Sequence, residues 1–270
     1  MRSESRPMKR LATFSVTAML AASTASTASA AEPVVVLAAG SLRPAFTEIG
    51  QNFERATGVP VAFEFGASGL LKDRILAGAP AQVFASANME HPRALAQAGK
   101  AEPERVFTRN VMCALARPEV DTSPERLLAT MLEPTIKLGT STPRADPSGD
   151  YAWEVFRKAE SVRAGSFAAL SAKALQLTGG APASPPAAGN VYAALLDSGQ
   201  ADVFLTYCTN AALVRQEQPR MKLVELPSAL AVGADYGVTV LRAAPPSAGR
   251  FVAFLLGPDG QGVLRRYGFR

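Results

Sequence analysis

Short apolar segments alternate with helical patterns along most of this chain, and that alternation restricts its fold more than any other feature. Residues 34–38 form a β-branched, apolar run that predicts a buried strand. Apolar residues between 42 and 53 then recur at the spacing of one helix face, and Gly58 ends that pattern. A strand at 59–65 and a helix at 70–76 repeat the unit. The alternation predicts an α/β protein whose sheets are mostly parallel and flanked by helices.

The alternation of predicted strands and helices continues to the end of the chain. Between the predicted elements, residues 179–189 are rich in Pro, Ala and Gly, which predicts a loop. Further strands are expected at 83–85, 111–116, 136–139, 203–207 and 236–241. Further helices are expected at 91–98, 126–132, 151–158, 167–175, 191–196, 251–256 and 262–267.

The N-terminus has the three parts of a secretory signal peptide. Four basic residues precede an apolar stretch from Leu11 to about Ala22, and small residues follow up to Ala28-Ser29-Ala30. This order predicts a signal peptide over residues 1–30, cleaved near Ala30, and hence a periplasmic protein. No Cys stands at that site to carry a lipid anchor. With Glu4, the segment holds +3 of the formal charge of +5. The remaining +2 is scattered, which argues against nucleic-acid binding.

Two cysteines and one histidine limit the metal and redox chemistry of the chain. Cys113 and Cys208 could pair in an oxidising compartment, but their separation in sequence cannot show that they come close enough. His91 is the single histidine and there is no CxxC motif, so a zinc site has too few ligands.

Two serines lie where a predicted strand gives way to a helix, each beside a glycine. Ser41 follows Gly40, and Ser68 precedes Gly69. A helix N-terminus at the carboxyl end of a parallel strand offers free backbone N–H groups, a partial positive charge and a hydroxyl donor. Either serine alone is explained as an ordinary N-cap. Two matching junctions on successive units favour an anion-binding site.

Several segments resemble the periplasmic molybdate-binding proteins of ABC transporters. The similar segments are, in order, Ala38-Ala39-Gly40-Ser41-Leu42, Phe65-Gly66-Ala67-Ser68-Gly69, the run from Gly78 to Ala87, and Gly199 to Ala211. The resemblance covers nearly all of the chain after residue 30. The first three segments are fairly specific to that family, whereas the middle of the chain is looser.

The resemblance implies a two-lobed binding protein of the type II periplasmic class. The first lobe would comprise residues 31–112 and 237–270, and the second 113–236, with two crossover strands at the hinge. A molybdate or tungstate ion would bind between the lobes without a cofactor or a free metal cation. The protein, a monomer and no enzyme, would deliver the ion to a membrane permease. The donors implied by the resemblance are Ser41, Ser68, Tyr151, Ala152, Val191 and Tyr207.

The chain also departs from that family. Gln82 and Asn88 stand in the third segment, where the family usually has Asp. Asp146 and Asp150 precede the expected helix at 151. A carboxylate that faced the ligand would repel it, unless it contacted the metal centre directly as in related tungstate-binding proteins. The favoured interpretation makes both aspartates loop and N-cap residues.

Two alternatives concern the ligand and the activity. Sulfate, phosphate or a small organic acid would suit a similar site, and Asp146 could accept the remaining proton of phosphate. A secreted serine hydrolase would have to use His91, which lies away from both serine motifs. No G-x-S-x-G motif is present, so the hydrolase is disfavoured.

Overall fold

Three parallel strands and the helices that follow them begin the folded part of the chain. The computed structural model describes Met1, residues 31–180 and residues 190–270. The predicted signal peptide, apart from Met1, and most of the predicted loop at 179–189 lie outside the described residues. Residues 31–270 belong to one compact unit.

Strand β1 (Val34–Ala39) pairs in parallel with β2 (Val61–Gly66) on one side and β3 (Val83–Ser86) on the other. A short 3-10 helix (Gly40–Leu42) leads into α1 (Arg43–Thr57), which ends at Gly58 in the left-handed conformation that glycine adopts at little cost. Helix α2 (Ser68–Leu76) follows β2, and α3 (Glu90–Gln97) follows β3. The predicted βα units are therefore present.

Two antiparallel strands connect the two halves of the sheet. In β4 (Arg105–Ala116), residues 105–111 pair with β9 (Gly233–Val240) and residues 112–116 with β7 (Val203–Tyr207). Strand β9 also pairs with β3, so the sheet runs β2-β1-β3-β9-β4-β7-β5-β6. The two long strands are the crossover strands of the predicted fold class. The lobe boundaries at 112/113 and 236/237 stay a prediction.

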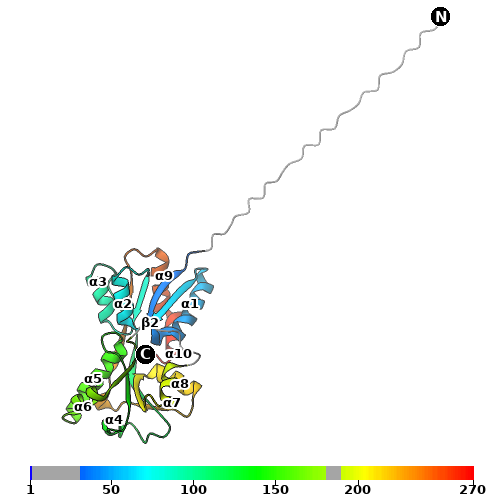
Figure 1. Cartoon of the computed structure of the whole chain (residues 1–270). Coiled ribbons are helices and arrows are strands. Elements are labelled where there is room, and N and C mark those ends of the chain that lie inside the picture. Colours follow the sequence, from blue (N-terminus) through cyan, green and yellow to red (C-terminus); the bar gives the residue numbers. More distant parts are fainter. Residues whose placement is uncertain (2–30, 181–189) are drawn as a thin grey trace. The chain divides into compact units, whose positions relative to one another are not determined.

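The second half of the sheet is again parallel at its core. Strand β5 (Leu138–Ser141) pairs in parallel with β6 (Leu175–Thr178) and β7, while β8 (Lys222–Glu225) pairs with β4. Figure 1 shows the helices gathered around the two halves. The helices of this half are α4 (Leu127–Leu132), α5 (Pro147–Val162), α6 (Ser166–Lys173), α7 (Val191–Asp197) and α8 (Cys208–Glu217). A 3-10 turn (Ser228–Leu230) follows β8, and α9 (Pro246–Leu256) and α10 (Pro258–Arg266) close the chain.

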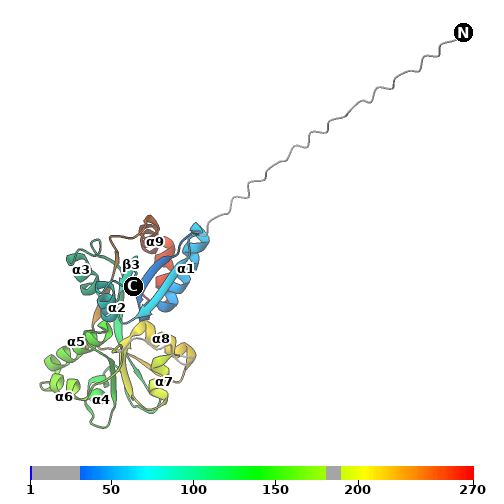
Figure 2. The same cartoon turned by 45° about the horizontal axis from the view of Figure 1, so that its top comes forward.

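Helices cover both faces of each half. Helix α1 packs with α9 and α10 on one face of β1, and α2 and α3 lie on the other (Figure 2). Buried aromatic rings hold the first layer together: Phe53 meets Phe251 edge to face at 5.4 Å between ring centroids. Burying such a ring contributes about 1.5–3 kcal/mol. In the second half, α5 covers one face, and α7 and α8 the other.

Several elements differ from the sequence prediction. The helix expected at 167–175 ends at Lys173, and Leu175 begins β6, where apolar and polar residues alternate. Helix α8 and strand β8 were not predicted at all. Helix α8 follows β7 without a loop and its apolar residues do not form a clear stripe, so periodicity gave no signal. Among the described residues, no helix is both long and apolar enough to cross a bilayer.

Candidate ligand-binding site

A cavity of about 580 Å³ lies where the carboxyl ends of strands from both halves of the sheet meet. Ala39, Gly66 and Ala87 line it at the ends of β1, β2 and β3. Thr178 and Tyr207 line it at the ends of β6 and β7. Ligands of open α/β sheets bind at this edge, because the helices that follow the strands direct their N-terminal N–H groups there.

Ser41 lies in the cavity wall, at the start of the helical segment that follows β1. Its Oγ is 2.9 Å from the hydroxyl of Tyr236 in β9, and the pair shares a hydrogen bond. The Nδ2 of Asn110 in β4 donates to the same tyrosine hydroxyl at 3.4 Å and to Thr209 Oγ1 at 2.9 Å. This network joins Ser41 to both crossover strands and to the first turn of α8.

Ser68 is buried at the first residue of α2, directly behind the cavity wall. It is not among the residues that line the cavity. Its Oγ accepts a hydrogen bond from the Ala87 N–H at 3.1 Å, which leaves its own hydroxyl proton available to donate. Its neighbour Gly69 donates its N–H to the carbonyl of Ala145 at 2.9 Å. This bond ties α2 to the loop before α5 in the other half of the sheet.

Helix α5 presents its N-terminus to the cavity through Asp146 and Ser148. Asp146 is the N-cap, and its Oδ1 accepts the Ser148 N–H at 3.1 Å. The N-cap interpretation is therefore confirmed for Asp146, but Asp150 lies inside α5 and is neither a loop nor an N-cap residue. Ser148 is buried and lines the cavity, and its hydroxyl has no hydrogen-bond partner within the described residues. A buried hydroxyl without a hydrogen-bond partner destabilises the folded protein, so its presence needs an explanation.

Tyr207 contributes a second hydroxyl of the same kind. The side chain is 2% exposed and lines the cavity, and its OH has no partner within 3.5 Å in the described part of the chain, although the Tyr236 hydroxyl lies nearby. Its ring packs against those of Tyr236 at 5.6 Å and Tyr151 at 6.3 Å between centroids. Burial raises the pKa of Tyr207 well above its ordinary value, so the group stays a neutral donor.

Two further helices begin at the cavity. Val191, the first residue of α7, lines it, and the Asn190 side chain caps the helix by accepting the Tyr192 N–H at 3.0 Å. In the first turn of α8, Asn210 lines the cavity and donates to Tyr192 OH at 3.2 Å and to Thr206 Oγ1 at 3.0 Å. Burial raises the pKa of Tyr192 to about 12.

The structure brings some of the predicted residues together and separates others. Ser41, Val191 and Tyr207 line one cavity, and Ser68 lies immediately behind its wall. Tyr151 and Ala152 do not line it. The helix expected from 151 begins at Pro147, which places both residues more than a turn from its start. Ala152 is fully buried, and at its position in the helix the backbone N–H serves the helix itself.

The charges in the wall are few. Arg43 is the basic side chain among the lining residues, and its guanidinium carbon lies 4.6 Å from the centre of the Phe65 ring. Asp146 is the acidic one, and burial raises its pKa. Asp150 accepts the Arg144 N–H at 2.8 Å and does not line the cavity. Among the described residues no cluster of His, Cys, Asp or Glu could hold a metal ion.

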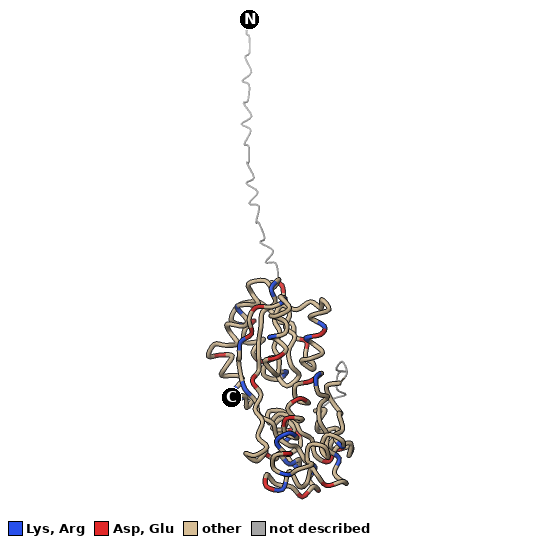
Figure 3. Tube along the Cα trace, turned by 90° about the vertical axis from the view of Figure 1, so that its left-hand side faces the viewer, with Lys and Arg blue, Asp and Glu red and all other residues tan. Residues whose placement is uncertain are grey.

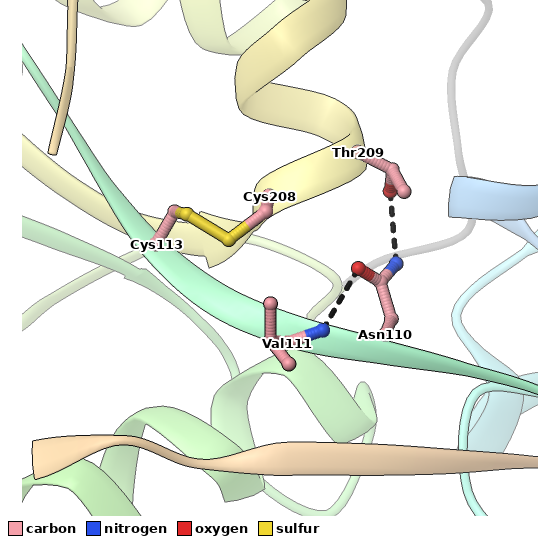
Figure 4. The surroundings of a disulfide bond; sticks show 5 residues. All are labelled: Asn110, Val111, Cys113, Cys208 and Thr209. Carbon is pink, nitrogen blue, oxygen red and sulfur yellow. Dashed lines mark hydrogen bonds between the residues drawn. A yellow bond between two sulfur atoms is a disulfide. The ribbon is translucent and has the colours of Figure 1, made fainter. Parts of the chain in front are cut away.

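A disulfide joins the crossover strand β4 to the start of α8. Cys113 and Cys208 are bonded, with 4.9 Å between their Cα atoms, which answers the question that their separation in sequence left open. Figure 4 shows the bond beside Asn110, whose side chain reaches Thr209 and the backbone of Val111. The disulfide and Asn110 thus hold the turn between Tyr207 and Asn210 against the same strand.

Comparison with known proteins identifies the family. The family model described as bacterial extracellular solute-binding protein matches residues 34–270. The chain belongs to this family. An uncharacterized protein of Pasteurella multocida is 36% identical over 238 residues, which is 87% of this chain and 97% of that one. The molybdate-binding protein ModA of Mycobacterium tuberculosis is 28% identical over 261 residues, 92% of this chain and 88% of the relative.

A solved structure shows the same fold. The sulfate-binding protein SubI of Mycobacterium tuberculosis superposes with a TM-score of 0.74 at 17% identity, over 89% of this chain and 86% of that one. The chain is thus a solute-binding protein with a mixed α/β periplasmic-binding-protein fold, and not an enzyme. The hydrolase alternative is wrong. In agreement, His91 lies in α3 and lines no part of the cavity.

Sequence reasoning missed Ser148 and Asn210. The order Asp146-Pro147 is a signal for a helix start, because Asp favours the N-cap and Pro the next position. That signal could have placed Ser148 at the site. No comparable pattern marks Asn210, since α8 itself was not predicted.

Proposed function

We propose that this protein captures molybdate or tungstate in the cavity and delivers the ion to the membrane permease of an ABC importer. One observation carries the proposal: two buried hydroxyls, of Ser148 and Tyr207, face the cavity without a partner among the described residues. Each could donate a hydrogen bond to an oxyanion. The 28% identity to a molybdate-binding protein over most of both chains supports this choice of ligand.

The donors are neutral, as a buried oxyanion requires. Hydroxyl and backbone N–H groups can surround a tetrahedral dianion without the larger cost of burying a cation beside it. Helices α1, α2, α5, α7 and α8 all begin at or beside the cavity, and each N-terminus carries a partial positive charge. Their summed field favours a small anion there.

The ligand set that we propose modifies the one expected from the sequence. Ser41, Ser68, Val191 and Tyr207 remain in it, with Ser68 reaching the ion through its free hydroxyl proton. Ser148 replaces Tyr151 and Ala152, since it is the residue of α5 that meets the cavity. Tyr151 instead supports the ring of Tyr207.

The proposal also covers the location of the protein in the cell and the closure of its lobes on the ligand. Residues 1–30 act as a signal peptide cleaved near Ala30, and the mature protein works in the periplasm as a monomer. Lobes of residues 31–112 with 237–270, and 113–236, close on the ion. Donors from both halves of the sheet, such as Ser41 and Tyr207, make closure depend on the ligand.

Isothermal titration of residues 31–270 tests the proposal. Molybdate, tungstate, sulfate and phosphate are added in turn to the parent and to Tyr207→Phe. We expect tight one-to-one binding of molybdate or tungstate, with sulfate far weaker. Loss of the Tyr207 hydroxyl removes one donor to a charged ligand, worth about 1.5–3 kcal/mol, so we expect the affinity to fall at least about tenfold.

Other results would change the proposed ligand, the proposed site or the proposed function. Preference for sulfate or phosphate would keep the oxyanion site and change the ligand. An unchanged affinity in Tyr207→Phe would remove that hydroxyl from the site. No heat with any of the four anions would contradict the proposed function.

A further inference from the structure

The acidic residue in the cavity wall is held in place from two sides. Asp146 Oδ1 accepts the Ser148 N–H at 3.1 Å, which fixes one oxygen on the N-terminus of α5. Gly179 packs against the carboxyl group: a Cβ added there would lie 2.8 Å from Oδ2. The backbone of Gly179 therefore lies close to the carboxyl group. Asp146 lies in a wall that it shares with Ser148 and Tyr207.

No cationic side chain in the described part of the chain is paired with this carboxyl group. Asp146 forms no salt bridge to any residue that the structure describes. Residues 181–189 contain no Lys or Arg in their sequence, so they cannot supply one. Arg43 lines the same cavity but lies over Phe65.

The titratable neighbours of Asp146 are hydroxyls or a second acid. Proximity to Asp146 contributes to the raised pKa values of Tyr192 in α7, Tyr207 in β7 and Tyr236 in β9. Asp150, one turn further along α5, adds negative charge. Burial and the charge of Asp150 therefore raise the pKa of Asp146, against hydrogen bonds from the Ser148 N–H and the Ser141 hydroxyl that lower it.

An oxyanion in this cavity would add two negative charges beside an unneutralised carboxyl group. Repulsion between like charges is strong where water is displaced, and a proton on one of them removes it. Burial already raises the pKa of Asp146 in the ligand-free protein, and a bound dianion raises it further.

We propose that the site binds its oxyanion together with one proton, held between the Asp146 carboxyl group and a ligand oxygen. The proton comes from solvent, and it turns a repelling carboxylate into one more hydrogen-bond donor. The inference rests on the proposed function and adds the protonation state of the complex to it.

The pH dependence follows from the direction of the shift. Affinity is constant below the pKa of Asp146 in the free protein. It falls as pH rises from that pKa to the higher pKa of the complex, by at most about tenfold per pH unit. Above the second pKa it is constant again.

The test is titration of residues 31–270 with molybdate between pH 6 and pH 9, in buffers of different ionisation enthalpy. Asp146→Asn is the matched variant, because Asn caps a helix as well as Asp and cannot take up the proton. Asp150→Asn is the control for a nearby acid outside the cavity wall. We expect the parent and Asp150→Asn to take up as much as about one proton on binding. Asp146→Asn should take up close to none, with an affinity that no longer falls with pH.

Three outcomes would overturn the inference. A parent that binds molybdate without proton uptake, at an affinity independent of pH, would show that the site takes up no proton from solvent with its ligand. Loss of binding in Asp146→Asn without proton uptake by the parent would show that the carboxylate contacts the metal centre directly. Absence of molybdate binding by both proteins at every pH would overturn the proposed function, and the inference with it.

Discussion

At the scale of single residues, two buried hydroxyls without a partner in the described residues lie together in the cavity wall, whereas the others of this kind, such as that of Ser166, lie away from it. A buried hydroxyl without a partner costs about 1–3 kcal/mol. Ser148 and Tyr207 each carry such a hydroxyl in one cavity wall. A ligand that accepts from both recovers that cost when it binds. The two unpaired hydroxyls lower the stability of the ligand-free protein, and ligand binding raises it again.

Ser148→Ala tests this at one residue. We expect molybdate affinity to fall by about 1–3 kcal/mol, while the free energy of unfolding of the ligand-free protein stays constant or rises slightly, because the orphan hydroxyl is gone. Titration calorimetry and chemical denaturation measure the two quantities. Ser166→Ala is the matched control: its hydroxyl is also buried without a partner in the described residues, but it lies in α6 away from the cavity. Equal affinity losses in both variants would contradict this account.

We expect contacts between elements from the two halves of the sheet to limit the proposed closure of the site. Gly69 lies at the N-terminus of α2 against the loop before α5, and a Cβ there would be 2.3 Å from the Arg144 carbonyl oxygen. The obstacle is backbone, so it cannot move aside as a side chain would. Glycine is required at this position by the close approach of the other half rather than by α2 itself.

Gly69→Ala should therefore weaken binding through closure. A penalty of about 1.4 kcal/mol on the closed form alone lowers affinity tenfold. Although Ala is otherwise favourable in a helix, the same contact is present in the described structure, so we also expect the free energy of unfolding of the ligand-free protein to fall. Small-angle scattering with and without molybdate, together with titration, measures closure and affinity. Gly249→Ala in α9, where a Cβ meets nothing within 4 Å, is the control. An unchanged affinity in Gly69→Ala would show that this contact does not limit closure.

The disulfide is the covalent link between elements. It joins Cys113 to Cys208, 95 residues apart, and so restricts the unfolded chain strongly. Replacing both residues by Ala should lower the free energy of unfolding by about 2–5 kcal/mol. Guanidinium denaturation measures the loss, with the reduced parent protein as the control. We also expect weaker molybdate binding, because Tyr207 and Asn210 flank Cys208. Unchanged stability in the double variant would contradict this role.

Elements with a clear period were predictable, and those without one were not. The βα units up to residue 97 and the strand at 203–207 followed from apolar spacing, and they placed Ser41 and Tyr207 correctly at strand ends. Helix α8 lacks an apolar stripe, so Asn210 could not be found. Partnerships across the fold, such as Ser41 with Tyr236, depend on packing that no local pattern encodes.

At the scale of the whole molecule, charge is dispersed rather than concentrated. Lys and Arg are interspersed with Asp and Glu along residues 31–270 (Figure 3). The exposed ion pairs, such as Arg109 with Asp235, contribute little to stability. Attraction for an anion must then arise locally, at the convergent helix N-termini and the neutral donors of the cavity.

We expect an oxyanion to bind among these neutral donors. A crystal structure of residues 31–270 grown with molybdate, with the molybdenum located by its anomalous scattering, tests it most directly. We predict one strong peak in the cavity, with ligand oxygens within hydrogen-bond distance of Ser41 Oγ, Ser148 Oγ and Tyr207 OH. A peak elsewhere on the protein, or a cavity that stays without molybdenum at saturating molybdate, would contradict the account.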